Sequence, residues 1–362
     1  MKILQLSTHL DRGGITSYVL NLSQGLRDLG HECALFTGGG THEIRLKELG
    51  LAHVRGMVPT SSELNPRLIP ATYRLVRLIR REKIEILHAH SRVTQVLCTL
   101  AGGLTRVPWV STCHGVYRNH WGRRVLPAWG RRTVAISKVV GDWLIREMGV
   151  PEAQVRRVNT GLDAAQWRPS SSAEPSLKER CGWQNSLLIG SVGRLSEEKG
   201  HTVLVEAFAQ VAAKNPLARL LLVGDGRLRP VLEQRIGAFG LQGIVRIEPA
   251  LDLPAHLHEL DLFVLPTSGI EGLGIAVLEA MAASVPVVAT RSGGPEELIE
   301  HGRTGWLVER GKHAAMAGLV LDLLNDERRR VSTVEPALEF VKREHSIENM
   351  ARSTAEIYQE LV

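Results

Sequence analysis

The sequence alternates short apolar runs with segments whose apolar residues recur at helical spacing. In the first half, the apolar runs lie at 3–8, 34–38, 84–90, 109–115 and 133–137. Between the first two runs, apolar residues recur every three or four positions, at Ile15, Tyr18, Val19, Leu22, Leu26 and Leu29, which predicts a helix with one buried face. A second such segment spans 66–82. Strands that alternate with helices favour a parallel sheet covered on both faces.

The same alternation begins again in the second half. Its expected strands lie at 187–194, 218–226, 244–250, 262–267 and 285–291, and a helical pattern at 346–362 ends the chain. The segment 168–180 separates the two series, is rich in Ser and Pro and has no apolar period, so we predict an interdomain linker there. The sequence therefore predicts two doubly wound α/β domains, whose ligands should bind at the carboxyl ends of the strands.

Composition narrows the class of protein. Hydrophobic residues make up 44% and charged residues 23% of the chain, as in soluble globular proteins. No apolar run reaches 18 residues and the N-terminus lacks the features of a signal peptide, so a cytoplasmic location is expected. The four cysteines are scattered singly, which favours buried apolar roles over metal binding or disulfides.

Charge is distributed unevenly between the halves. Residues 1–168 hold 24 Lys and Arg against 12 Asp and Glu, whereas the remainder holds 20 against 26. A basic half suggests an anionic partner, either nucleic acid, a membrane surface or a phosphorylated substrate. A solvated surface with no partner is the alternative.

Two glycine-containing loops are candidates for binding phosphate. The loop after the first strand holds only Gly13-Gly14 instead of GxGxxG, which argues against a dinucleotide-dependent enzyme but still lets a phosphate approach a helix N-terminus. In VGRLSEEKG (192–200), Arg194 and Lys199 follow an expected strand and can clamp a diphosphate. The alternative is a turn in which Glu197 and Glu198 pair locally. No DxD triplet for a divalent cation occurs.

The stretch EGLGIAVLEA (271–280) places Glu271 and Glu279 eight positions apart. Eight helical residues rise about 12 Å, whereas the carboxylates of glycosidases lie roughly 5 to 9.5 Å apart. The spacing therefore suits groups that hold opposite ends of an extended ligand better than an acid–base pair. Two glutamates on a solvated helix face are the alternative.

Histidines and basic segments are weaker candidates. His114 follows an expected strand and could contact a substrate, and a loop histidine with partners inside the protein is the alternative. His88 and His90 alternate on one strand without a third metal ligand nearby. The segment 118–132 mixes arginines with tryptophans, and 71–83 carries five basic residues beside an apolar stripe. Both fit an anionic membrane surface, and no recognition module for nucleic acid accompanies them. For 71–83, the alternative is a core-facing helix with a solvated basic face. We take the membrane or acceptor surface to comprise Arg118, Trp121, Arg123, Arg124 and Trp129.

Together these motifs resemble the family 4 retaining glycosyltransferases, also called glycosyl transferases group 1, which have the GT-B fold. The resemblance is most specific in 192–200, in LVGDG (222–226) and in 265–308, which contains the Glu-x7-Glu motif of the family. HAHS (88–91), STCHG (111–115), AISKVVGDWL (135–144) and VNTGLD (158–163) extend it through the first half. Ala283-Ser284 stands where a glycine usually precedes Val-Pro-Val.

The resemblance implies two Rossmann-like domains facing across a cleft. Residues 1–165 would bind the acceptor, 166–344 would bind a nucleotide-diphosphate sugar, and the helix at 345–362 would return to the first domain. Arg194 and Lys199 would bind the diphosphate, Glu271 and His114 the transferred sugar, and Glu279 the ribose. The remaining residues expected at the nucleotide sugar are Gly13, Gly14, Gly193, Gly224, Arg246, Ile247, Glu248, Pro249, Gly272, Leu273, Gly274 and Ile275.

The implied activity is a metal-independent and cofactor-independent transfer of a hexose-type sugar with retention of configuration. UDP is the favoured nucleotide and GDP the next. The acceptor would be a lipid-linked or envelope glycan at the inner face of the cytoplasmic membrane. Two alternatives remain open: a soluble transferase with a small acceptor, and a catalytically silent subunit that binds nucleotide sugars.

Overall fold

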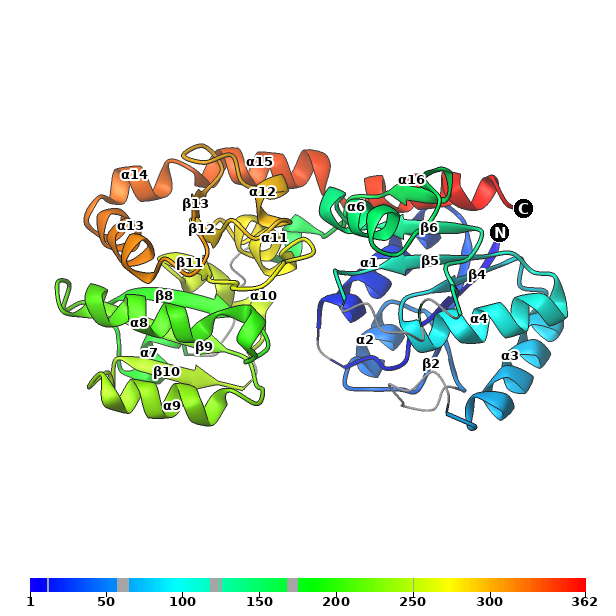
Figure 1. The fold of residues 1–362 in the computed structure, drawn as a ribbon, viewed down its shortest axis with the longest axis horizontal. Coiled ribbons are helices and arrows are strands. Elements are labelled where there is room, and N and C mark those ends of the chain that lie inside the picture. The colour runs from blue at the N-terminus through cyan, green and yellow to red at the C-terminus, as the bar shows by residue number, and fades with distance from the viewer. Residues whose placement is uncertain (12, 57–64, 118–122, 124–125, 168–174, 250) are drawn as a thin grey trace. The chain divides into compact units, whose positions relative to one another are not determined.

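The computed structural model describes all residues except 12, 57–64, 118–122, 124–125, 168–174 and 250. The chain forms two compact units (Figure 1). Unit 1 comprises Met1–Leu162 and His345–Val362, and unit 2 comprises Asp163–Glu344. The chain thus enters unit 2 before the Ser- and Pro-rich segment, and its last helix belongs to unit 1.

Unit 1 is built on a parallel sheet of seven strands in the order β3-β2-β1-β4-β5-β6-β7. The strands are β1 (Lys2–Leu6), β2 (Glu32–Thr37), β3 (Ala52–Arg55), β4 (Ile86–Ala89), β5 (Trp109–Cys113), β6 (Arg132–Ala135) and β7 (Val155–Arg157). The helices are α1 (Gly14–Asp28), α2 (Glu43–Glu48), α3 (Leu68–Glu82), α4 (Arg92–Thr105), α6 (Lys138–Arg146) and α16 (Ile347–Gln359), with a 3-10 turn η1 (Glu152–Gln154). The strand order reverses between β1 and β4, which is where ligands bind in open α/β sheets.

Unit 2 repeats this design with six parallel strands in the order β10-β9-β8-β11-β12-β13. The strands are β8 (Leu187–Val192), β9 (Ala218–Val223), β10 (Val245–Glu248), β11 (Leu262–Leu265), β12 (Val287–Thr290) and β13 (Trp306–Val308). The helices are α7 (Leu177–Cys181), α8 (His201–Ala212), α9 (Arg229–Ala238), α10 (Leu253–His256), α11 (Ile275–Ala282), α12 (Pro295–Leu298), α13 (His313–Asn325), α14 (Glu327–Val331) and α15 (Val334–Glu344). Short 3-10 turns are η2 (Ala164–Trp167), η3 (Glu197–Lys199) and η4 (Leu257–Glu259). Here the order reverses between β8 and β11.

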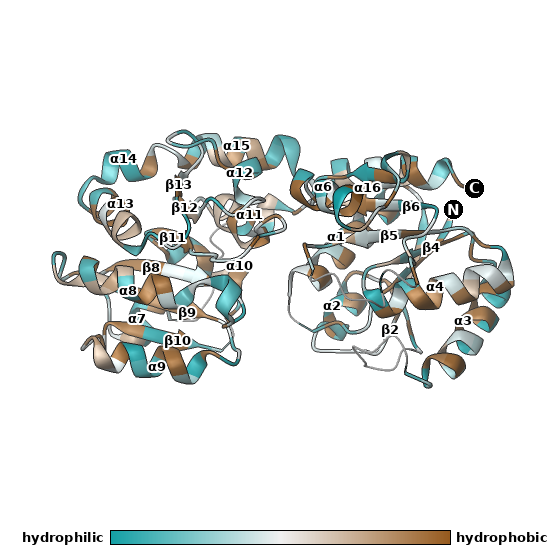
Figure 2. Cartoon of the chain, viewed as in Figure 1, coloured by the Kyte–Doolittle hydropathy of each residue, from teal (hydrophilic) through white to brown (hydrophobic). Residues whose placement is uncertain are grey.

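The periodicity of the sequence explains most of these elements. Each of the ten predicted apolar runs overlaps a strand, and the two doubly wound sheets are confirmed. In α3, the buried residues recur at helical spacing, and hydrophilic residues interrupt the hydrophobic ones along the helix (Figure 2). Three short strands, β3, β7 and β13, were not predicted. All three lie at sheet edges and have three or four residues, too few for a clear period.

Two expectations about the second half need correction or refinement. The predicted linker is wrong for its last part, because 177–181 is helix α7, which Ser176 caps by accepting a hydrogen bond from the amide of Glu179. Residues 168–174 lie outside the described part of the chain. The unusual Ser284 has a φ of 60° just beyond α11. Such left-handed conformations favour glycine at helix C-termini, which is the physical reason that the resembling family has glycine there.

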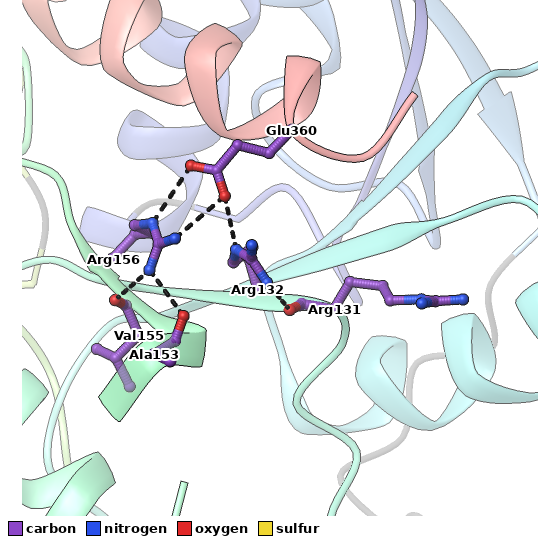
Figure 3. Close-up of polar contacts among 6 residues, drawn as sticks. All are labelled: Arg131, Arg132, Ala153, Val155, Arg156 and Glu360. Carbon is purple, nitrogen blue, oxygen red and sulfur yellow. Dashed lines mark hydrogen bonds and ion pairs between the residues drawn. The ribbon is translucent and has the colours of Figure 1, made fainter. Parts of the chain in front are cut away.

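Helix α16 contacts other elements of unit 1 near its start, along one face and at its end. It packs on α1 at Gly25, where a Cβ would lie 2.7 Å from the side chains of Ala351 and Ile347. Beside its start, the amide of Leu162 donates to the carbonyl of His345 at 2.9 Å. At its end, the Glu360 carboxylate accepts hydrogen bonds from Arg132 and Arg156, at 2.7 and 3.1 Å (Figure 3). These two arginines hold the pKa of Glu360 below its usual range.

We expect Glu360→Gln to loosen α16 without unfolding unit 1. The three side chains are partly exposed, and exposed ion pairs contribute about 0.2–1 kcal/mol each. Since the pKa of Glu360 is lowered, its contribution is present at neutral pH and lost as pH falls below the usual pKa of glutamate. Hydrogen exchange of α16 amides at pH 7 measures the effect. Glu356→Gln, on the exposed face of the same helix, is the control, and equal exchange in both variants would contradict the prediction.

Candidate active site

Two cations lie where the sheet of unit 2 reverses its strand order. Arg194 and Lys199 both follow β8, as the sequence predicted. The Arg194 side chain is exposed and has no ion-pair partner among the residues that the structure describes. The Lys199 side chain is only 25% exposed. Gly200 turns the chain immediately after it with a φ of 71°. A Cβ at Gly200 would lie 2.0 Å from the carbonyl oxygen of Pro266, so this close approach of the two loops requires glycine.

Lys199 pairs with the first glutamate of the Glu-x7-Glu stretch. Its Nζ lies 2.7 Å from Oε2 of Glu271, and the Thr267 hydroxyl donates to the same oxygen at 3.1 Å. Glu271 precedes α11, and its amide donates to the carbonyl of Ser292 at 2.8 Å. Strand β8 pairs directly with β11, so the loops after them meet at the reversal point. The structure thus brings the predicted cation and carboxylate together. Thr267 was missed, since a lone threonine after a strand carries no sequence signal.

Helix α11 begins between the two glutamates. Gly274 is its N-cap residue, and the first helical residue is Ile275. Gly272, Leu273 and Gly274 are buried. The positive end of a helix dipole favours an anion, and residues 272–275 lie at this end of α11. Glu271 therefore lies before the helix and Glu279 within it, so the two glutamates do not share one helical face.

Glu279 has an unusual electrostatic environment. Its carboxyl group has no hydrogen-bond or ion-pair partner among the described residues. Although Glu279 keeps some surface exposure, the surrounding protein raises the pKa of its carboxyl group from 4.5 to about 8, because an ionised carboxylate loses much of the water that would stabilise it. Hydroxyl groups of a ligand could donate hydrogen bonds to this carboxyl group. Those hydrogen bonds would replace the water that the ionised form lacks and would lower its pKa again.

The remaining candidates of unit 2 lie at the same edge of the sheet. Gly193 and Gly224 follow β8 and β9, and the amide of Gly224 donates to the carbonyl of Glu248 at 2.8 Å. Arg246 and Glu248 on β10 form an ion pair at 2.8 Å. Ile247 is partly buried and Pro249 is exposed. Gly193, Gly224, Glu248 and Pro249 thus lie at the carboxyl ends of strands, whereas Arg246 and Ile247 lie within β10.

In unit 1, the candidates also lie at the carboxyl ends of strands. Gly13 is the N-cap residue of α1, and Gly14 is the first residue of that helix. His114 follows β5, and its ring meets that of Tyr18 edge to face at 4.8 Å between centroids. Burial lowers the pKa of His114 to about 3, so its imidazole is uncharged at neutral pH.

The structure gathers three histidines that the sequence treated separately. His88 and His90 on β4 and beyond it lie beside His114, with the His90 and His114 rings 5.4 Å apart. The His90 Nδ1 and His114 Nε2 atoms are 3.2 Å apart and share a hydrogen bond. In the described residues, no group of three or more His, Cys, Asp and Glu side chains is arranged to hold a metal ion. The alternating histidines therefore form a hydrogen-bonded cluster.

Of the five residues expected at a membrane or acceptor surface, the structure describes only Arg123 and Trp129. Arg118, Trp121 and Arg124 lie outside the described residues. Trp129 is only 4% exposed, and its ring packs against Trp143, so the expectation that it anchors a membrane is wrong. The Arg123 guanidinium lies over the rings of Tyr117 and Trp129, at 4.9 and 6.0 Å. Within the part of the chain that the structure describes, no helix is long and apolar enough to cross a membrane.

Family models match both halves of the chain. The model described as "Glycosyltransferase Family 4" matches residues 12–166, and the model described as "Glycosyl transferases group 1" matches residues 186–326. The first match covers Gly13, Gly14 and the histidine cluster. The second covers both glutamates and both cations. Together the two matches include every candidate site residue named above.

Curated relatives and solved structures agree with these matches. A GDP-mannose-dependent alpha-(1-6)-phosphatidylinositol monomannoside mannosyltransferase of Mycolicibacterium smegmatis is 35% identical over 188 residues, 49% of each chain, so this chain spans about half the length of that relative in the match. A D-inositol 3-phosphate glycosyltransferase of Corynebacterium kroppenstedtii is 27% identical over 97% of this chain and 86% of its own. The structure of Anabaena HepE in complex with UDP and glucose superposes with a TM-score of 0.88 at 22% identity, covering all of both chains. At that identity the likeness establishes the fold.

Proposed function

The chain belongs to the family 4 glycosyltransferases of the GT-B fold, and we propose that it transfers a hexose-type sugar from a nucleotide-diphosphate sugar with retention of configuration. The acceptor we propose is a lipid-linked or envelope glycan, and the reaction needs no metal ion. The single observation that carries the proposal is the arrangement at the strand reversal of unit 2. There, Lys199 contacts Glu271, Arg194 lies in the same loop after β8, and the N-terminus of α11 follows Glu271 along the chain.

This arrangement suits the departure of a phosphate. When the bond between the sugar and the diphosphate breaks, negative charge develops on the leaving phosphate and positive charge on the sugar. Fixed cations and the positive end of a helix stabilise the phosphate in the transition state, because they need no reorganisation as the charge develops. Lys199 and Arg194 supply the cations, and Lys199 is already oriented by its contact with Glu271.

Each carboxylate then has a distinct role. When the donor binds, its phosphate replaces Glu271 as the partner of Lys199, and Glu271 then contacts the transferred sugar. Glu279 accepts hydrogen bonds from the ribose hydroxyls, for which its unpartnered carboxyl is suited. Neither needs to move a proton, since the departing phosphate assists deprotonation of the acceptor in the mechanism that the family is thought to use. In unit 1, Gly13, Gly14 and His114 are the proposed contacts to phosphate and sugar.

The nucleotide and acceptor are proposed from the relatives. UDP is favoured because HepE was solved with UDP, and GDP is next because the mycobacterial relative is GDP-mannose-dependent by name. That relative acts on a phosphatidylinositol mannoside, and others are named for amylovoran and colanic acid biosynthesis, which supports a lipid-linked or polysaccharide acceptor. Base recognition is assigned to 246–249 at the end of β10.

Release of free nucleotide tests the proposal. The protein is incubated with UDP-, GDP- and ADP-sugars and with lipid-linked or oligosaccharide acceptors, in the presence of EDTA. We expect turnover with one sugar donor, undiminished by EDTA, and a product whose anomeric configuration by NMR matches that of the donor. Nucleotide binding without turnover for any pair would instead favour a silent binding subunit, and an inverted product would contradict retention.

A small soluble acceptor is the second candidate. It is favoured by the inositol 3-phosphate glycosyltransferase, which matches this chain over 97% of its length. Including D-inositol 3-phosphate among the acceptors distinguishes the two candidates directly. Turnover with this acceptor, and none with glycans or lipids, would replace the first candidate by the second.

A membrane-facing surface is proposed on α3 and α4, which pack side by side in unit 1. Their exposed faces carry large apolar residues next to arginines. The apolar residues are Ile69, Tyr73, Leu100 and Leu104, and the basic ones are Arg74, Arg77, Arg80, Arg81 and Arg106. The Arg77 guanidinium lies 5.9 Å from the centre of the Tyr73 ring. Apolar side chains surrounded by arginines favour the interface of an anionic bilayer.

We expect the protein to float with anionic liposomes at low salt, and Tyr73→Ser combined with Leu104→Ser to reduce the bound fraction several-fold. Each lost apolar side chain weakens insertion, and salt screens the arginines. Phe239→Ser in unit 2 is the control, since Phe239 is 48% exposed but lies on another unit. Absence of flotation, or an equal loss in the control, would contradict the assignment of this surface.

A further inference from the structure

The histidine cluster of unit 1 is one end of a chain of hydrogen bonds. The chain starts at Tyr358 on α16, whose hydroxyl accepts a hydrogen bond from Nε2 of Gln5 at 3.3 Å. Oε1 of Gln5 lies 2.6 Å from Nε2 of His90. Nδ1 of His90 lies 3.2 Å from Nε2 of His114. Gln5, His90 and Tyr358 are at most 1% exposed, so bulk water cannot replace any of their contacts.

The direction of each hydrogen bond follows from the chemistry of the groups. The carbonyl oxygen of Gln5 can only accept, so Nε2 of His90 carries a proton. Burial lowers the pKa of His90 well below its usual value, so this ring is neutral and its Nδ1 is bare. A bare Nδ1 can only accept, so Nε2 of His114 carries the proton of that ring. Burial keeps His114 neutral too, and its Nδ1 must therefore be bare.

A second series of hydrogen bonds also starts at Tyr358 and runs through His88 to Thr112. The Tyr358 hydroxyl accepts from Gln5 and keeps its own proton, which it can donate to Nδ1 of His88, 2.5 Å away. Nε2 of His88 then donates to the Thr112 hydroxyl at 2.7 Å. Both series of hydrogen bonds thus depend on one amide orientation at Gln5, and the helix that ends the chain supports that orientation through Tyr358.

These hydrogen-bond directions leave Nδ1 of His114 as an acceptor without a donor. Nδ1 of His114 is buried and has no hydrogen-bond partner in the described part of the chain. A bare nitrogen without a partner attracts a hydroxyl or another hydrogen-bond donor and repels a phosphate oxygen or a carbonyl. It lies after β5, next to the strand reversal between β1 and β4 where a ligand of unit 1 is expected.

We propose that Gln5, His90 and Tyr358 are positioning residues that hold His114 in the tautomer with a bare Nδ1, so that it accepts a hydrogen bond from a sugar hydroxyl. The tautomer stands on the contacts described above, whereas the sugar as its ligand rests on the proposed function. The C-terminal helix therefore contributes to the selectivity of the site through Tyr358, although it contributes no residue that touches the substrate.

Nitrogen-15 NMR of histidine-labelled full-length protein tests the tautomer without any substrate. We expect the Nδ1 signal of His114 in the range of an unprotonated ring nitrogen. Gln5→Glu should invert it, because a carboxylate beside His90 favours the imidazolium, whose Nδ1 proton then turns Nε2 of His114 into the acceptor. A protonated Nδ1 in the wild type, or an unchanged tautomer in Gln5→Glu, would overturn the proposal.

Kinetics tests the consequence for the site. Tyr358→Phe keeps the ring but removes the hydroxyl, and we expect turnover to fall about tenfold, equivalent to 1.36 kcal/mol. The affinity for UDP alone should not change, because His114 is assigned to the transferred sugar, which UDP lacks. Glu356→Gln, on the exposed face of the same helix, is the control. Unchanged turnover in Tyr358→Phe would overturn the positioning role. Absence of transfer by the wild type with every sugar donor would reject the proposed function instead, and the NMR result would still decide the tautomer.

Discussion

Replacing Arg194 or Lys199 with alanine is expected to lower turnover by about 10²–10³-fold while the fold stays intact, as when one preorganised electrostatic contact to a transition state is removed. Both cations lie beyond the carboxyl end of β8, and Lys199 is held 2.7 Å from Glu271. Turnover should fall more than affinity for the nucleotide, because charge on the leaving phosphate is greatest in the transition state. Steady-state kinetics and calorimetric binding of UDP or GDP measure the two effects.

The control for this prediction is Arg227→Ala. Arg227 is an exposed arginine after β9, at the same edge of the sheet, and its ion pair with Glu197 is loose at 3.7 Å. It should retain wild-type turnover, and circular dichroism should confirm that all three variants fold. Near-wild-type rates in both Arg194→Ala and Lys199→Ala would show that the leaving phosphate is stabilised elsewhere.

Glu279→Gln is expected to have two opposite effects, a loss of nucleotide affinity and a gain in stability of the free protein at alkaline pH. The pKa of Glu279 is about 8 in the folded protein against 4.5 when unfolded. The folded state therefore holds a proton that the unfolded state has lost, and stability falls as pH rises from 4.5 through 8. Above pH 8 the buried charge costs a few kcal/mol, at roughly 1.4 kcal/mol per pKa unit. Glutamine carries no charge and avoids this cost.

Thermal unfolding and nucleotide binding between pH 5 and 9 measure both effects. The melting temperature of Glu279→Gln should exceed that of the wild type by a margin that grows with pH. Wild-type affinity should rise with pH up to about 8, since ribose hydroxyls bind the ionised carboxylate, whereas the affinity of the variant should not. Glu339→Gln, an exposed glutamate of α15, should show neither effect. Unchanged nucleotide affinity in Glu279→Gln would contradict the ribose assignment.

The fold was largely predictable because its information is local. Buried parallel strands are continuous apolar runs, and helices with one buried face repeat every three or four residues. Neither signal depends on distant residues. Edge strands such as Val155–Arg157 escaped prediction because a strand exposed on one side needs no apolar run. Helix α7 escaped because five residues are too few to show a period, although Ser176 and Glu179 form a capping box.

The site was predictable where short motifs determine its geometry. Glycine at 200 and 274 and the glutamates at 271 and 279 lie in loops and a helix whose local spacing sets their positions. Burial was not predictable in the same way. Trp129 resembled an interfacial anchor in sequence but is a core residue, and Glu279 resembled an exposed helical glutamate but has a raised pKa. Exposure depends on which elements pack together, which short patterns do not specify.

The sequence by itself determined the two doubly wound units, the family and the residues expected at the phosphate, because each of these is specified within a few neighbouring positions. Tertiary structure alone decided which of those residues meet. It placed Lys199 against Glu271 across 72 positions. It also joined Gln5 to Tyr358 across 353 positions. Such contacts depend on strand order and helix packing, and a buried polar group takes its charge and its tautomer from the partners that the fold provides.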